Sequence, residues 1–102
     1  MNVTCWSNGS PRKTGSGYGI KIRKYDRDRY FSKHWKNITI IIPKIGQIVT
    51  SLSPSFWGEC VEIRSKYIGL FIIHNSLHKW RRGKPHVLNL SKVSSNKFRL
   101  KR

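Results

Sequence analysis

The chain has 102 residues, of which 21 are Lys or Arg and only four are Asp or Glu, so its formal net charge at pH 7 is +17. This length is enough for a single domain with one modest core and not for two. Hydrophobic residues make up 37% of the chain and aromatic residues 12%. A disordered basic tail is therefore excluded, because such tails lack large apolar side chains.

The positive charge is distributed along the whole chain. Residues 1–50 contain ten basic and two acidic side chains, and residues 51–102 contain eleven and two. A compact domain with so much like charge repels itself. Phosphate backbones are its commonest partners, because each Lys or Arg that neutralises a phosphate releases a counterion. Composition therefore predicts a nucleic-acid partner. A membrane partner is not expected, since the chain has no basic amphipathic helix with a clean apolar face.

The first 17 residues are rich in Ser, Gly, Asn and Thr. We expect residues 1–17 to form a flexible basic N-terminal arm and residues 18–102 a single globular domain. The arm lacks the apolar segment of a signal peptide, which favours a cytoplasmic location. Arg12 and Lys13 are candidate groove contacts, as in the basic arms of other DNA-binding proteins. The alternative is a disordered tail with two charges.

Residues 19–24 alternate apolar and basic side chains, which predicts a half-buried strand with Lys21 and Arg23 on its outward face. Residues 25–31 are expected to form one helical turn with Asp26 as its N-cap. Together these segments hold the densest basic run of the chain, which suits a track of phosphate groups. The candidate binding residues here are Lys21, Arg23, Lys24, Arg27 and Arg29.

Residues 35–42 and 47–52 also alternate, and the first segment places Ile38, Ile40 and Ile42 on one face. The turn signal Pro43–Gly46 separates them, so we expect a β-hairpin.

Two helices are expected next. Ser53 as N-cap and a proline at the first helical position predict a short helix near 54–58. Apolar residues then recur every three or four positions, which predicts the main helix over about 60–77.

Cys60, His74 and His78 have the spacing of half a zinc site. A two-Cys, two-His finger needs another Cys just upstream, and Trp57 stands there. We therefore expect no metal and no cofactor, with Cys60 and His74 facing the core from the main helix. Cys60 and Cys5 are expected to be free thiols, because the cytoplasm is reducing.

Residues 80–85 form a basic loop before two final strands, which are expected over 86–90 and 97–100. Arginines bind phosphate through two parallel hydrogen bonds, and a neighbouring tryptophan can stack on a base or sugar. The alternative is a solvated turn whose tryptophan is part of the core. The candidate contacts in this loop are Trp80, Arg81, Arg82 and Lys84.

These elements predict an α+β domain, a small curved sheet or partly open β-barrel of about five or six strands with one main helix. Their order over residues 18–101 resembles that of plant B3-type DNA-binding domains, which are β-pseudobarrels with helices at their ends. The resemblance implies a clamp of two basic arms around a groove of a duplex. Residues 21–29 and 80–84 would be these arms, provided that they share a face.

The sequence predicts non-enzymatic binding of DNA or RNA and does not choose between them. A small metal-free ribonuclease is an alternative, since its chemistry needs only His, Lys or Arg beside the phosphate. Its candidate residues are His34, His74, His78 and His86. A third possibility is a small accessory or inhibitor protein that docks on an acidic or nucleoprotein partner. An exposed apolar patch at Ile72 and Ile73 would favour that function.

Overall fold

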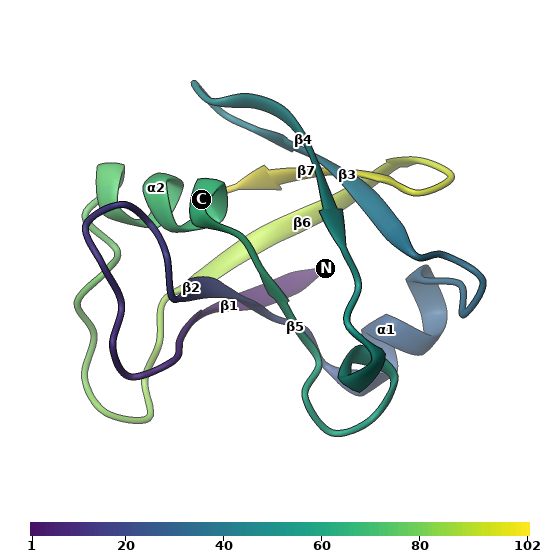
Figure 1. Ribbon diagram of the computed structural model, residues 1–102, viewed down its shortest axis with the longest axis horizontal. Coiled ribbons are helices and arrows are strands. Elements are labelled where there is room, and N and C mark those ends of the chain that lie inside the picture. The colour runs from purple at the N-terminus through teal and green to yellow at the C-terminus, as the bar shows by residue number, and fades with distance from the viewer.

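Seven strands form one mixed sheet that curves into a nearly closed barrel, with two α-helices packed at its ends (Figure 1). The computed structural model describes all 102 residues. The strands are β1 Asn2–Ser7, β2 Tyr18–Lys21, β3 Asn37–Ile42, β4 Gly46–Ser51, β5 Glu62–Arg64, β6 Val87–Ser94 and β7 Lys97–Lys101. The helices are α1 Lys24–Tyr30, the 3-10 helix η1 Pro54–Trp57 and α2 Lys66–His74. This confirms the predicted α+β barrel, although the strands are slightly more numerous than expected.

The strand order is β4-β3-β7-β6-β1-β2-β5, and all neighbours are antiparallel except the parallel pair β3 and β7. The edge strands β4 and β5 meet where the Thr50 hydroxyl donates a hydrogen bond of 3.5 Å to the Arg64 carbonyl oxygen. A side chain, and not a backbone ladder, therefore joins these two edges, and the barrel is partly open.

The interior is filled by the inward side chains of the alternating strands. Ile38, Ile40 and Ile42 on β3 are fully buried, and β3 pairs with β4 throughout the hairpin, as the alternation predicts. At one end, α2 packs with its residues Ile68, Phe71 and Ile72 buried. Aromatic rings fill the other end, where the ring centres of Phe31 and Phe98 are stacked 4.8 Å apart.

The predicted main helix over about 60–77 is too long at both ends, because α2 covers only Lys66–His74. Residues 62–64 form β5, in which Ile63 is buried and the flanking residues point outward. Ser65 then starts α2 as its N-cap, because its hydroxyl accepts a hydrogen bond from the Tyr67 N–H. Cys60 and His74, which a single long helix would turn toward the core, are both exposed. Neither α1 nor α2 has the length and apolar sequence that a membrane-spanning helix needs.

The N-terminal segment differs from the expected arm, because residues 2–7 form β1 near the middle of the sheet. β1 lies between β6 and β2, and its Val3 and Cys5 side chains are only 1% and 3% exposed. The polar residues that suggested an arm are the outward half of this alternation. The first strand is therefore part of the core, and the globular domain begins well before residue 18.

Residues 8–17 form the ordered loop that joins β1 to β2. The Asn8 N–H donates to the Gly17 carbonyl, and the Arg12 N–H donates to the Ser16 carbonyl at 2.8 Å. Gly15 is buried against α2, where a side chain would overlap the Lys66 carbonyl oxygen. The glycines that suggested flexibility instead allow close packing.

Candidate nucleic-acid interface

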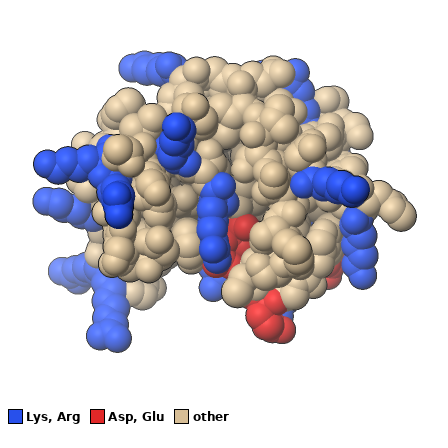
Figure 2. Space-filling view, viewed as in Figure 1, with Lys and Arg blue, Asp and Glu red and all other residues tan.

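Most of the positive charge has no acidic partner. Three ion pairs are present, Lys24 with Glu59 at 2.8 Å, Arg27 with Asp28 at 3.0 Å and Arg64 with Glu62 at 3.4 Å. All four carboxylates lie on α1, just after η1 or on β5. Figure 2 shows the blue Lys and Arg side chains around the whole outline of the molecule, while the red carboxylates occupy only its lower half. The outward sides of β7, β6, β1 and β2 therefore hold no carboxylate, and the adjacent carboxylate Glu62 on β5 lies opposite Lys21.

The outward residues of β7, β6, β1 and β2 form a continuous face without a carboxylate. In the register, Lys101 lies opposite Asn89, Asn89 opposite Asn2, and Thr4 opposite Lys21. Small polar side chains in the middle of the face are thus flanked by cations on both sides. We call this surface the basic sheet face. It consists of Arg23, which follows β2, and of the strand residues Asn2, Thr4, Lys21, Val87, Asn89, Ser91, Lys97, Arg99 and Lys101.

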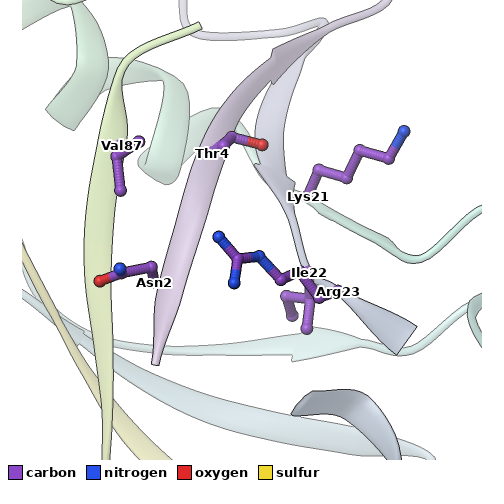
Figure 3. A pocket seen from close by; sticks show the side chains of 6 residues that line it. All are labelled: Asn2, Thr4, Lys21, Ile22, Arg23 and Val87. Carbon is purple, nitrogen blue, oxygen red and sulfur yellow. The ribbon is translucent and has the colours of Figure 1, made fainter. Parts of the chain in front are cut away.

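A shallow depression of about 250 Å³ lies within this face, between β6 and the end of β2. Figure 3 shows the Arg23 guanidinium extending over β1 between Asn2 and Thr4, while Lys21 extends away from it. Both cationic side chains are exposed and the intervening Ile22 is buried. The predicted outward placement of Lys21 and Arg23 therefore agrees with the structure.

Arg64 and Trp6 extend the basic sheet face toward the loop over residues 8–17. The Arg64 guanidinium lies over the Trp6 ring, 4.7 Å from its centre. The register pairs Gly19 with both residues, so no side chain on β2 separates them. A second depression of about 300 Å³ adjoins this stack and is also lined by Asn8 and Lys66. Neither Trp6 nor Arg64 is among the binding residues predicted from the sequence. The alternation of buried Val61 and Ile63 with outward neighbours is the signal that places Arg64 on a strand.

The loop over residues 80–85 is a tight turn in which the Lys84 N–H donates to the Arg81 carbonyl at 2.8 Å. Gly83 adopts a φ of 76°, which side chains disfavour. Trp80 is half-buried and packs against the core, so its ring supports the fold. Arg81, Arg82 and Lys84 are all exposed, and their contact with nucleic acid stays a prediction.

The predicted loop contacts gather at one end of the barrel. Arg12 and Lys13 line a cavity of about 480 Å³ together with His78 and Lys79. The His86 carbonyl accepts a hydrogen bond from the Cys5 N–H, which fixes the segment after the 80–85 loop beside β1. Figure 1 shows the two loops side by side at the left, and Figure 2 shows several basic side chains projecting from that edge. Arg12 and Lys13 thus lie beside residues 78–79, and the segment that follows the 80–85 loop lies beside β1.

The α1 residues of the predicted basic run lie at the opposite end of the barrel from these loops (Figure 1). Arg27 is only 8% exposed, and its Nη1 donates to the carbonyls of Phe56 and Gly58 at 3.0 and 3.1 Å. Its guanidinium also lies 5.2 Å from the centre of the Trp57 ring. Arg27 therefore joins α1 to η1 and is not free to contact a phosphate.

The two other cations of α1 are exposed but locally engaged. Lys24 donates a hydrogen bond to Glu59 and, with its charge, lowers the pKa of that carboxyl. The Arg29 guanidinium lies 5.4 Å from the centre of the Tyr30 ring. Of the run over residues 21–29, only Lys21 and Arg23 belong to the basic sheet face.

The histidines and cysteines do not form a shared site. His74 and His78 line different cavities, and a ring nitrogen of His86 bonds with the Lys79 carbonyl at 3.0 Å. Burial raises the pKa of the Cys5 thiol to about 11, whereas Cys60 is exposed. No group of three or more His, Cys, Asp or Glu side chains is arranged to hold a metal ion.

No protein family, curated protein or solved structure matches this chain. The resemblance to B3-type domains therefore stays a prediction.

Proposed function

We propose that the protein binds DNA or RNA without catalysis, by contacting phosphates through the basic sheet face and the adjoining loops. The observation that carries this proposal is the charge pattern of four adjacent strands. Their outward side chains include Lys21, Arg99 and Lys101 but no carboxylate. Such a surface has a favourable free energy of binding to a polyanion through counterion release.

The shape of the basic sheet face suits a backbone that lies across it. Neighbouring strands are about 4.8 Å apart, so the cations on β7 and β2 are separated by about 14 Å. The residues between them include the short polar side chains of Asn2, Thr4 and Asn89 and the exposed Val87. Their amide and hydroxyl groups are typical donors to phosphate oxygens. A phosphate chain can therefore approach the sheet closely and be neutralised from both sides.

The test is the salt dependence of binding, measured by fluorescence anisotropy with labelled DNA and RNA oligonucleotides. We expect the logarithm of the association constant to fall linearly with the logarithm of salt concentration, with a slope that reflects several phosphate contacts. An affinity that hardly changes between about 50 and 200 mM salt would contradict the proposal.

A matched pair of variants tests whether binding uses this face or only the total charge. Lys21→Gln/Arg23→Gln removes two cations from the basic sheet face, and Lys36→Gln/Lys44→Asn removes two exposed cations before β3 and in the β3–β4 turn. Asn is chosen at 44 because that residue has a φ of 65°, which Asn tolerates. We expect only the first variant to reduce the affinity by more than about tenfold. Equal losses in both variants would indicate diffuse attraction.

One cavity supports a ribonuclease as a second candidate. His78 lies there with Arg12, Lys13 and Lys79. In a metal-free ribonuclease, a histidine of this kind transfers a proton as a general acid or base beside the phosphate. RNA that stays intact during incubation with the protein, with and without a chelator, would exclude this activity. The third candidate, a protein-docking module, has less support, because Ile72 is fully buried and Ile73 packs against the core.

A further inference from the structure

We propose that the nucleic acid is single-stranded where it passes the end of β1, and that an unpaired base stacks on the free face of Arg64. On the protein side, the Arg64 guanidinium carbon lies over the Trp6 ring. This inference depends on the proposed function, because it assumes that phosphates are held on the basic sheet face. It identifies an unpaired base as a part of the ligand that the protein recognises in addition to the phosphate charge.

The position of Trp6 is the first observation behind this inference. Trp35, Trp57 and Trp80 pack against the hydrophobic core, but Trp6 does not. Its ring lies on the outward face of β1, with Gly19 beside it in the register. A large aromatic ring on an outward sheet face adds little to the core, so its contact with a ligand is the simplest explanation.

Arg64 is held on this ring and remains accessible. Its guanidinium carbon lies 4.7 Å from the centre of the ring, and its Nη2 donates to Glu62 Oε1 at 3.4 Å. The Glu62 side chain is 8% exposed, while that of Arg64 is 60% exposed. The Glu62 carboxylate therefore restrains the guanidinium through one of its N–H groups, while most of the Arg64 side chain stays open to solvent. Unpaired bases stack on planes of this kind, both aromatic rings and Arg guanidinium groups.

The depression beside the stack supplies groups for the edge of a base and for its phosphate. Its volume is about 300 Å³, and its lining includes Asn8, Ser65 and Lys66. Asn8 Oδ1 already accepts from the Ser10 N–H, so its amide NH₂ is left to donate. Ser65 Oγ accepts from the Tyr67 N–H and keeps its own proton to donate. Lys66 adds a positive charge at the rim.

A duplex cannot use this surface in the same way. Its bases are stacked on one another, so their faces are covered and only phosphates and groove edges reach the protein. An unpaired base has a free face, and its stacking contributes a free energy that a backbone contact does not provide. The Trp6–Arg64 stack therefore predicts a preference for single strands over duplexes of equal length.

The experiment compares single-stranded and duplex oligonucleotides of one length in the same salt, each as DNA and as RNA. Arg64→Lys keeps the charge but removes the planar guanidinium. We expect this variant to bind single strands about tenfold more weakly and duplexes within about twofold of the unchanged protein. Arg29→Lys is the matched control, because it removes the guanidinium over the Tyr30 ring at the other end of the barrel. It should change neither affinity.

Trp6→Ser provides a second variant, and its urea midpoint is measured beside that of the unchanged protein so that a folding defect is recognised. Loss of single-strand affinity in both Arg64→Lys and Trp6→Ser, with folding intact, supports the stacked base. Preference for duplex in the unchanged protein, or single-strand affinity that Arg64→Lys leaves unaltered, overturns it while phosphate binding stands. A protein that binds neither form overturns the proposed function as well. The DNA and RNA arms show whether the sugar contributes.

Discussion

The backbone of Gly15 lies directly against the backbone of Gly69 in α2, so that a Cβ atom on Gly69 would overlap the Gly15 carbonyl group. Contact this close is possible only where both residues lack a side chain. It fixes the loop over residues 8–17 on the helix and with it the positions of Arg12 and Lys13. A basic segment that looks mobile in the sequence is thereby held at a defined place beside the end of β1.

Gly69→Ala should destabilise the protein by about 1 to 3 kcal/mol, because the methyl group overlaps backbone atoms that cannot move independently. Urea denaturation measures this loss. His74→Ala, at an exposed position of the same helix, should stay within about 0.5 kcal/mol of the unchanged protein. A Gly69→Ala protein of unchanged stability would show that the loop is not held by this contact.

Arg27→Met should cost about 2 to 4 kcal/mol of stability, because it removes the donor from two backbone carbonyls, one of them buried. Arg29→Met, on the exposed side of the same helix, is the control and should change stability by less than about 0.5 kcal/mol. Urea denaturation of both variants checks this difference. If Arg27→Met folds normally but loses nucleic-acid affinity, the structural assignment of Arg27 is wrong.

The two thiols should differ in reactivity toward a disulfide reagent at pH 8. Cys60 is exposed and should react within minutes, whereas Cys5 is buried and should react only on unfolding, since its pKa is raised to about 11. The raised pKa also has a consequence for stability. Because the folded state favours the protonated thiol, its contribution to the free energy of unfolding is fully present below about pH 9. This contribution is lost as the pH rises through about 11. Cys60→Ser should abolish the fast reaction, and two fast equivalents in the unchanged protein would contradict the buried position of Cys5.

Arg81→Gln/Arg82→Gln should weaken nucleic-acid binding and lower the salt slope by about two, if both exposed arginines contact phosphates. The same titrations on Lys36→Gln/Lys44→Asn provide the charge-matched comparison. An unchanged slope in the loop variant would restrict the interface to the basic sheet face. Trp80 is not expected to contribute directly, because its ring packs against the core.

Much of the barrel follows from local patterns in the sequence. The alternating isoleucines of residues 38–42 predict an inward face, and the Ser53–Pro54 pair predicts the start of η1, because both signals depend only on near neighbours. β1 is concealed by polar residues on its outward side. β5 is concealed because Cys60 and Ile63 fit the helical spacing of the residues that follow, and only strand pairing decides between the two conformations.

The candidate interface, like the barrel, is predictable from the sequence only where a local pattern determines it. Lys21 and Arg23 follow from a period of two within one strand, and the exposed cations of the 80–85 loop follow from composition. Arg27 looks equivalent to its neighbours in the sequence, yet the helix turns it toward the carbonyls after η1. Trp6 and Arg64 are distant in the chain and meet only through the register of three strands, which no local pattern contains.

The place of β7 in the sheet has a consequence for the order of events during synthesis. β7 alone connects the β3–β4 hairpin by backbone hydrogen bonds to β6 and the strands beyond it, so the hairpin has no backbone-paired neighbour until residues 97–101 are made. Contacts between such distant segments also make folding slow. The nascent chain therefore carries an isoleucine-rich hairpin without its hydrogen-bonded partner strand until β7 is made.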